Sequence, residues 1–395
     1  MATIFPGSAS VGQVFDGYTF DGTAWNINGI DLTENYLEES SASSTYLTQV
    51  SASTTYAPIV PAVQTGFRNA IINGDFGINQ RGFTSLTTNG AYGFDRWLTH
   101  ASSGGTYSAQ TFTPGAAPVS GYEGKNFYRI VTTGQSGADV YTSFEQRIED
   151  VRTFAGQTTT VSFWAKATSG TPKAGVSGLQ QFGTGGSPSS DVIITGSTVT
   201  LSTSWARYSV TLNVPSISGK TVGTTDNTSI LRLDLWTSVG TTISGAGYPA
   251  VGIQNATIQF WGVQWEAGSI ATPFQTATGT IQGELAACQR YYYRTTADSA
   301  YTIFGNGSAV STTQANAIIP LPVTLRTSAS SVESASLALF DGVTVVAVTS
   351  TVLQYTGRNS GNVNLSVASG LTQYRPYFAI SNNTTSGYIA FNAEL

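Results

Sequence analysis

Short runs of alternating apolar and polar residues, separated by turns rich in Gly, Ser and Thr, fill most of this chain from about residue 66 onwards. Alternation with a period of two is typical of β-strands that bury one face, and helical periodicity is nearly absent. The pattern predicts eight strands in the middle of the chain, over 91–100, 126–133, 140–148, 158–167, 190–201, 205–214, 229–238 and 256–266. Strands of this spacing indicate an all-β fold, with a jelly roll or sandwich at its centre.

The same pattern divides the chain into four parts. Alternating residues around Asp21-Gly22 predict a small hairpin near the N-terminus, because this dipeptide readily forms a tight turn. We expect an N-terminal β module over 1–34, a stalk of ten-residue repeats over 35–65, a jelly roll over 66–280, and over 281–395 a bridging segment with a C-terminal β-sandwich. Within the last part, residues 281–293 are expected to form one short helix or turn. The predicted molecule is an elongated, multidomain fibre.

The repeat is marked by Tyr36, Tyr46 and Tyr56, which stand ten residues apart, with Leu37 and Leu47 after the first two. Each unit offers too little apolar surface to offset an ordering cost of roughly 1–2 kcal/mol per residue. The segment is therefore either a disordered linker or one strand of an oligomeric stalk. We favour the stalk, with these five residues at the chain–chain contact, because a plain linker has no physical reason to keep tyrosine in register.

Composition excludes several classes of partner. The chain has 17 Lys and Arg against 22 Asp and Glu, and its basic residues are scattered, so nucleic acid is not an expected partner. Apolar runs fall short of the roughly 18 residues of a membrane span, and the first residues lack the features of a signal peptide. We expect synthesis in the cytoplasm and no insertion into a membrane.

Residues suited to catalysis are scarce. His100 is the only histidine and is interpreted as a turn or surface residue, while Cys288, the only cysteine, is interpreted as a small buried side chain. The remaining option is a carboxylate pair of the glycosidase type, with groups about 5 Å or roughly 6.5–9.5 Å apart. The candidate acids are Asp95, Glu145, Glu149, Asp150, Asp234 and Glu266. Hydrolase activity is the less favoured alternative.

Sugar binding asks for less, namely an aromatic face to stack on a sugar ring and polar groups for its hydroxyls. Two predicted strands each place a tryptophan beside charged residues, on the side opposite to their aliphatic residues. These outward sets are Trp164 with Lys166, and Arg232 with Asp234 and Trp236. The alternative is that neighbouring chains of an oligomer cover these faces. The tryptophans expected in the core are Trp97, Trp261 and Trp265.

A set of landmarks in a fixed order supports this interpretation. They are residues 68–82, 92–97, 144–150, 161–167 and 262–269, and the last leads into Cys288-Gln289-Arg290-Tyr291-Tyr292. Together they resemble the carbohydrate-binding-module-type jelly roll that recurs in the tail-fibre proteins of tailed phages. Residues 1–34 resemble a short module found near the ends of many phage structural proteins.

The resemblance implies a homotrimeric virion fibre. Its N-terminal module would attach to other tail or baseplate proteins, and its β domains would bind host cell-surface polysaccharide without catalysis. The alternatives are a depolymerising tailspike, or a structural or capsid-decorating fibre that binds no sugar. The resemblance also implies a structural calcium, for which Asp75 and Glu266 are the candidate ligands and no other cofactor is expected. The alternative for Asp75 is a tight turn in which it accepts backbone N–H groups.

The stalk interpretation predicts that replacing Tyr36, Tyr46 and Tyr56 together by serine loosens the oligomer, because it removes the aromatic contacts along the common axis. Light scattering measures this directly, since one chain has a mass of 41.4 kDa. A triple variant that stays an equally stable oligomer would identify the repeat as a linker.

Overall fold

The computed structural model describes residues 7–15, 18–20, 22–23, 25–27, 68–116, 119 and 121–395. The chain separates into two compact units, Met1–Thr65 and Gly66–Leu395. The repeat of Tyr36, Tyr46 and Tyr56, with Leu37 and Leu47, lies outside the described residues, so its role stays a prediction. Among the described residues, no helix combines the length and apolar character needed to cross a membrane.

The first unit contains a small antiparallel sheet of three strands, β1 (Val14–Phe15), β2 (Tyr18–Phe20) and β3 (Trp25–Ile27), in that order. Tyr18 of β2 pairs with Ile27 of β3, and Phe20 pairs with Trp25. The hairpin expected around Asp21-Gly22 is confirmed by this pairing.

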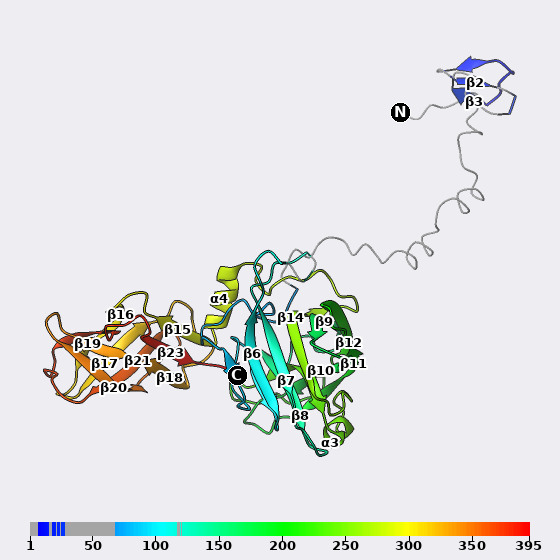
Figure 1. Ribbon diagram of the computed structural model, residues 1–395. Coiled ribbons are helices and arrows are strands. Elements are labelled where there is room, and N and C mark those ends of the chain that lie inside the picture. Colours follow the sequence, from blue (N-terminus) through cyan, green and yellow to red (C-terminus); the bar gives the residue numbers. More distant parts are fainter. Residues whose placement is uncertain are drawn as a thin grey trace. The chain divides into compact units, whose positions relative to one another are not determined.

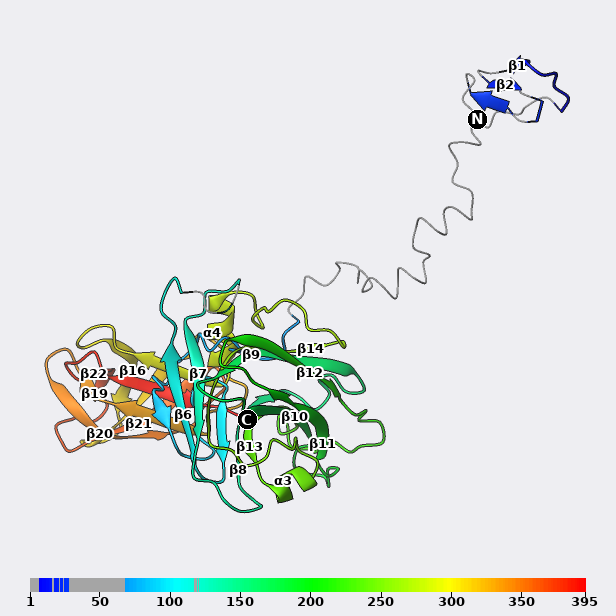
Figure 2. The same cartoon turned by 45° about the vertical axis from the view of Figure 1, so that its right-hand side comes forward.

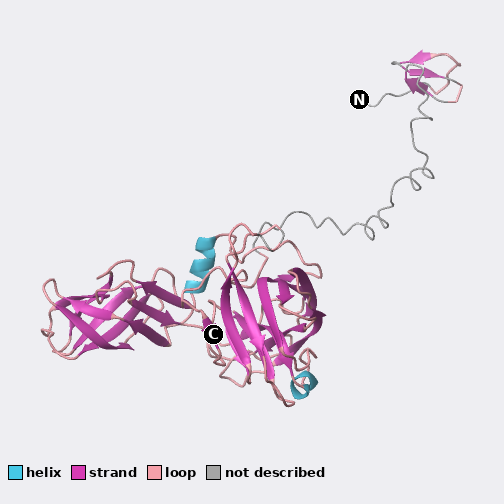
Figure 3. Ribbon diagram, viewed as in Figure 1, coloured by secondary structure: helices cyan, strands magenta, loops and turns pink. Residues whose placement is uncertain are grey.

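The second unit begins with a sandwich of two antiparallel sheets (Figures 1 and 2). The five-stranded sheet has the order β11 (Val192–Thr200), β10 (Lys173–Gln181), β13 (Ile230–Val239), β8 (Tyr141–Ile148), β5 (Leu98–Ala101). The six-stranded sheet has the order β12 (Ala206–Asn213), β9 (Thr158–Ala167), β14 (Ala256–Ala267), β7 (Asn126–Thr132), β6 (Gly105–Thr111), β4 (Ser85–Leu86). Helix is confined to α3 (Thr241–Gly245) and α4 (Ile281–Gln289) within the described chain (Figure 3). The all-β, jelly-roll-type prediction is confirmed.

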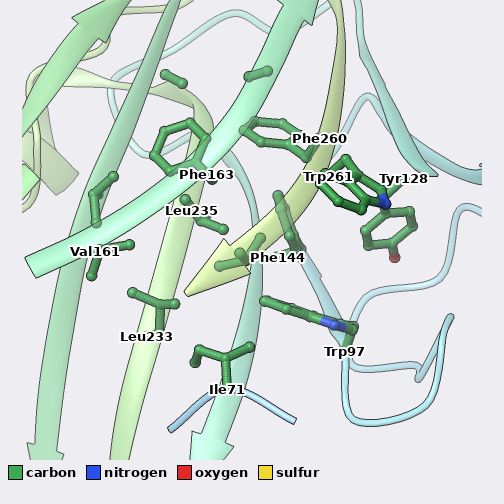
Figure 4. Packing of buried hydrophobic residues seen from close by; sticks show 14 of the residues in the cluster. Ile71, Trp97, Tyr128, Phe144, Val161, Phe163, Leu233, Leu235, Phe260 and Trp261 are labelled. Atoms are coloured by element: carbon green, nitrogen blue, oxygen red, sulfur yellow. The ribbon is translucent and has the colours of Figure 1, made fainter. Parts of the chain in front are cut away.

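The core of the sandwich lies between the two sheets and is rich in aromatic side chains (Figure 4). Phe260 lies 5.8 Å from Phe163 and 5.0 Å from Phe144, measured between ring centroids, so one ring joins both sheets. Trp97 continues the stack 5.2 Å from Phe144. Trp97, Trp261 and Trp265 are all buried, as predicted.

Two polar residues from the landmark segments fasten loops to this core. The side chain of Asn69 accepts hydrogen bonds from the backbone N–H groups of Ile71 and Trp265, and it donates to the carbonyl of Val263. Glu266 accepts hydrogen bonds from the backbone N–H and the hydroxyl of Thr272. Buried polar groups need such partners, so these landmark residues serve the loops of the fold.

Seven of the eight predicted strands agree with the structure to within two residues at each end. The predicted strand over 91–100 is mostly wrong, because residues before Leu98 form turns and Arg96 has a φ of 72°. Strands β4, β6 and β10 of the sandwich were missed, and in β10 glycines weaken the pattern. A methyl group at Gly175 would lie 2.7 Å from Val251, so the close approach of the loop after α3 explains the glycine.

The C-terminal part of this unit contains two sheets. A small sheet has the order β15 (Tyr292–Thr296), β23 (Tyr388–Asn392), β18 (Ser331–Ala335). A closed barrel has the order β16 (Ile303–Ala309), β17 (Gln314–Pro320), β21 (Ser360–Val367), β20 (Val345–Leu353), β19 (Leu337–Phe340), β22 (Pro376–Ser381). The sequence predicted a β-sandwich here, whereas β22 pairs with both β16 and β19 and so closes the sheet on itself. Alternation alone does not distinguish a closed sheet from two stacked ones.

A buried arginine connects the sandwich to the C-terminal part. Arg96 is almost fully buried, forms an ion pair with Glu394 and donates a hydrogen bond to the carbonyl of Arg147. Its guanidinium lies 3.4 Å from the ring centroid of Tyr291, which follows α4. Arg326 adds hydrogen bonds to the backbone carbonyls of Ala393 and Glu394. The chain around Glu394 is therefore held against the sandwich.

Tight packing in the C-terminal part predicts that Gly361→Ala destabilises it by about 1–3 kcal/mol. A methyl group at Gly361 would lie 2.1 Å from the ring of Phe391, which is fully buried. The measurement is urea unfolding. The matched control is Gly357→Ala, where the nearest atom is the Ser360 hydroxyl at 3.9 Å, and this variant should unfold like the parent. Equal midpoints for both variants would contradict the packing described.

Candidate functional site

The outer face of the five-stranded sheet carries a group of charged residues, which we call the outer-face cluster. Its members are His100 on β5, Glu145 and Arg147 on β8, and Arg232 and Asp234 on β13. Phe144 and Ile148 on β8, and Leu231, Leu233 and Leu235 on β13, belong to the core, so alternation directs the cluster to the opposite face. Antiparallel pairing sets Asp234 opposite Glu145 and Arg232 opposite Arg147. The fold thus assembles the cluster from three neighbouring strands.

Arg232 is the centre of this cluster. Its Nε lies 2.9 Å from Oδ1 of Asp234 and 3.4 Å from Oε2 of Glu145. Arg147 holds the other oxygen of Glu145 at 2.9 Å, and His100 Nδ1 lies 3.6 Å from Glu145 Oε2. The negative charges of two carboxylates and the positive charges of two guanidiniums therefore balance, and the imidazole of His100 lies beside them.

Three atoms of the cluster are buried without a hydrogen bond of good geometry, namely Oε2 of Glu145, Oδ1 of Asp234 and Nε of Arg232. Asp234 is completely buried and Glu145 nearly so. Their attraction is ionic, and burial of charge without full hydrogen bonding is costly. The outer-face cluster therefore costs the fold stability that aliphatic side chains at the same positions would not cost.

Burial also changes proton affinity in the cluster. Burial raises the pKa of Asp234 to about 7, with Arg232 acting to lower it and Glu145 acting to raise it further. Burial lowers the pKa of His100, and Glu145 acts in the opposite direction. Near neutral pH the imidazole is therefore mainly uncharged, while Asp234 exchanges a proton.

The cluster resembles a metal site only at first sight. Ligand atoms of His100, Glu145 and Asp234 all lie within 4.8 Å of one another, and they form the one such group among the residues that the structure describes. However, Nε of Arg232 already lies between the two carboxylates. A fixed guanidinium supplies the positive charge that a metal ion would bring, and it would repel that ion. The donor set therefore does not fit a metal.

Aromatic side chains border the cluster. The Tyr141 ring lies 4.7 Å from the His100 ring, and its hydroxyl lies 3.2 Å from His100 Nε2. Trp236 is buried between Tyr141 at 6.1 Å and Tyr248 at 5.0 Å. Tyr248 belongs to the loop after α3, which folds over this end of the sheet and forms a small apolar cluster with Val251. Both tyrosines are half-buried, so part of each ring presents aromatic surface beside polar groups.

The same face leads into a pocket at its other end. The pocket has a volume of about 290 Å³, and most of the residues that line it have polar side chains. Arg147, Gln181 and Ile230 occupy outward positions at the ends of β8, β10 and β13, next to Arg232 in the register. Its lining residues are Arg147, Gln181, Gly183, Thr184, Asp191, Asn227, Thr228, Ile230, Arg326 and Leu395. The pocket therefore lies on the same face as the outer-face cluster, and Arg147 belongs to both.

A second, larger pocket of about 640 Å³ lies next to it and shares Asn227 with it. Glu149 and Asp150 line this pocket together with hydroxyl-bearing residues from the loop 222–229. Arg290 holds Glu149 at 2.8 Å and Arg152 forms an ion pair with Asp150. Each of the two acids is thus already paired with an arginine of the same chain.

The structure separates the two outward sets that the sequence proposed as sugar-binding. Trp164 and Lys166 lie on β9 in the six-stranded sheet, whereas Arg232, Asp234 and Trp236 lie on β13 in the five-stranded sheet. The two sets cannot form one site.

The expectation of exposed tryptophans was also wrong. Trp164 is covered by Tyr122 at 5.2 Å and Phe274 at 6.0 Å, which come from loops that the strand pattern does not reveal. Trp236 is covered by Tyr248 and donates its indole N–H to the hydroxyl of Ser177. Each tryptophan therefore lies beneath the aromatic residues that cover it and is not itself available to a ligand.

The residues that sequence reasoning missed are His100, Tyr141 and Tyr248. His100 lies near the end of β5 with its side chain partly exposed, and what the sequence did not reveal is its contact with Tyr141 and Glu145. Its pairing with Ser143 follows from sheet order, which one sequence does not give. Cys288 is buried, as predicted.

The two residues proposed as calcium ligands have other partners here. Asp75 accepts a hydrogen bond from the backbone N–H of Gly77, which agrees with the alternative of a tight turn. Both carboxylate oxygens of Glu266 accept hydrogen bonds, from Thr272 and Gln264. The calcium site stays a prediction that these contacts do not favour.

The cluster predicts an unusual dependence of stability on pH. Asp234 has a raised pKa in the folded state, so between its unfolded value of 3.8 and about 7 the folded chain binds more protons. Stability from this group is therefore present at low pH and is lost as the pH rises through 7, by at most about 1.4 kcal/mol per pH unit. His100 acts oppositely, because its lowered pKa costs stability only as the pH falls below 6.5.

Urea unfolding between pH 6 and 8 separates the two effects. The parent should lose stability as the pH rises through 7, and Asp234→Asn should remove this slope even if it is less stable throughout. Asp298→Asn changes an exposed acid far along the sequence and should keep the slope of the parent. A slope that survives in Asp234→Asn would show that another group causes it.

Comparison with known proteins gives only remote likenesses. No protein-family model matches the sequence, and no curated protein is similar to it. Among solved structures, the enzymatically active domain of tailspike protein 4 of bacteriophage CBA120 is 11% identical with a TM-score of 0.28. The match covers 51% of this chain and 21% of that chain, so this chain spans about a fifth of its length.

Two carbohydrate-binding modules are similarly distant. The family 11 module from Clostridium thermocellum, in complex with a β-1,3-1,4-mixed-linked tetrasaccharide, is 12% identical with a TM-score of 0.26. The match covers 48% of this chain and 99% of the module. The xylan-binding domain from Paenibacillus barcinonensis is 14% identical with a TM-score of 0.25, over 48% of this chain and 94% of that domain. Likenesses at this level do not assign a ligand, which has to be argued from the site itself.

Proposed function

We propose that this chain is a non-catalytic attachment fibre of a phage virion and binds host cell-surface polysaccharide through the outer face of the five-stranded sheet. The observation that carries the proposal is the combination on one face of half-buried tyrosines, a fixed ionic cluster and a pocket lined mostly by polar residues. Sugars need both elements, an aromatic plane for the ring and fixed polar groups for the hydroxyls.

The geometry suits a chain-like ligand better than a small compact one. Tyr141 and Tyr248 lie at one end of the face, and the pocket with Gln181 and Asp191 lies at the other. Arg147 contributes both to the outer-face cluster and to the pocket. A polysaccharide could stack on the tyrosines and place further units over Arg147. Arg232, Asp234 and Trp236 would act from beneath, by holding the exposed groups in position.

The order of the parts along the chain supports a role in a virion. A small N-terminal module, a periodic segment, a jelly roll and a C-terminal β domain follow one another as they do in tail fibres. In this proposal the module binds tail or baseplate proteins, and three chains associate as a homotrimer. Three linked sites would raise a weak affinity for a repeated sugar by a factor on the order of 10².

Catalysis is not part of the proposal, although two carboxylates stand close together. Ligand oxygens of Glu145 and Asp234 lie within 4.8 Å, which is near the separation of about 5 Å in retaining glycosidases. However, both acids are buried and Arg232 lies against both. A nucleophile or general acid has to reach the substrate, so these acids are placed to organise the face.

We predict that Tyr141→Ala and Tyr248→Ala each weaken polysaccharide binding about tenfold, because each removes a stacking surface worth more than about 1 kcal/mol. Binding would be measured on an array of bacterial surface polysaccharides and confirmed by calorimetry with the best ligand. Tyr355→Ala is the matched control, since Tyr355 is 87% exposed but lies beyond β20 in the C-terminal domain. Parental binding by both site variants would reject this face.

The same ligand tests the catalytic alternative. Incubation with the full chain should release no reducing ends. Release that is abolished by Glu145→Gln would instead identify a depolymerase that uses the paired acids. A parent that binds no polysaccharide at all would favour a purely structural fibre.

A further inference from the structure

The wall of the C-terminal barrel differs from the rest of the described surface in its charge. None of its six strands, β16, β17, β19, β20, β21 and β22, contains Asp, Glu, Lys or Arg. By contrast, the outer faces of the sandwich carry charges in both sheets, such as Lys166 and Arg207 on one and Glu145 and Arg232 on the other. The strands of the barrel wall are therefore uncharged, and the ion pair of Asp341 and Arg375 lies at the ends of β19 and β22.

This wall also carries exposed apolar side chains that the register places in one line. Ile318 of β17 pairs with Asn306 of β16, which pairs with Phe378 of β22. Phe378 pairs with Phe340 of β19, which in turn pairs with Val345 of β20. Directly paired residues point to the same side of a sheet, so these residues form one lateral row across neighbouring strands. We call Ile318, Phe340, Val345 and Phe378 the barrel row.

The row is exposed to a degree that is unusual for such residues. Ile318 is 55%, Phe378 44% and Val345 41% exposed, and Phe340 is half-buried. With strands about 4.8 Å apart, the row extends roughly 19 Å around the barrel. Phe378, Phe340 and Val345 are direct neighbours, and Asn306 separates them from Ile318. A group of exposed apolar residues marks a contact site on a protein, whereas single exposed apolar residues need no explanation.

The chemistry of the wall identifies its partner. Cores of protein interfaces are depleted in charged residues, and a charge buried against this wall would find no counter-ion on the barrel strands. Asn306, within the line, and Asn362, which pairs with Ile318, supply neutral donors and acceptors only. A neutral wall therefore fits another neutral wall. Within the described residues of this chain, that surface is the barrel wall of a second copy.

We infer that the barrel wall, centred on the barrel row, is a surface through which copies of this chain associate. The inference rests on the homo-oligomer of the proposed function and names a contact for it that is independent of the tyrosine repeat. It does not involve the outer-face cluster, since the row lies on the barrel strands and the cluster on β5, β8 and β13.

The test introduces charge into the row of the full chain, as Ile318→Glu with Phe378→Glu. Light scattering at micromolar concentration should show the parent at about three times 41.4 kDa and the double variant at one third of the parental mass. The matched control is Ile270→Glu, at a residue that is 60% exposed in the sandwich, and it should keep the parental mass. Circular dichroism and polysaccharide affinity per chain, which should match the parent, establish that the variant is folded.

Three results would overturn the inference, and they differ in what else they affect. A folded double variant with the parental mass would exclude the barrel wall and leave the oligomer to the tyrosine repeat. A monomeric parent would exclude both this surface and the proposed trimer, but polysaccharide binding, measured separately, would stand. Loss of mass in the Ile270→Glu control as well would show that added charge acts generally and not at the row.

Discussion

The ion pair of Arg96 and Glu394 is the constraint on which the second unit depends. It buries one charge from the sandwich against one from the last residues of the chain, with Tyr291 stacked on the guanidinium. Breaking a buried ion pair leaves an uncompensated charge. Separation of the sandwich from the C-terminal part is therefore unfavourable, beyond the loss of the attraction between the two charges. The consequence reaches the candidate site, because Leu395 accepts a hydrogen bond from Arg147 and lines the pocket beside it.

Much of the fold could be predicted from the sequence because the sandwich strands have clean alternation. Leu231, Leu233 and Leu235 face the core as predicted, and the neighbouring strands follow the same rule. What escaped prediction depends on contacts between distant segments. The glycines of strand β10 weaken its alternating pattern, and Gly175 is needed because the loop with Val251 packs against it. The barrel closes through the pairing of β22 with β19. Neither feature leaves a local pattern in the sequence.

The candidate site was predictable only in part. Alternation correctly set Arg232, Asp234 and Trp236 on the side away from the core, but it could not show which strand lies beside β13. The partners Glu145 and His100 come from β8 and β5, and Tyr248 comes from a loop, so the site exists only once the sheet order is known. Burial of Trp236 has the same origin, because a loop covers a face that the strand alone would expose.

The position of His100 has a practical consequence. It is the chain's only histidine, and its imidazole lies against Glu145 and Tyr141 at the centre of the candidate site. In a chain labelled only at histidine, the ring therefore gives a single set of NMR resonances without any need for assignment. Their chemical shifts would respond to the proton on Asp234, to displacement of Tyr141 and to a ligand on the face. The molecule thus contains one native probe, located where its chemistry is concentrated.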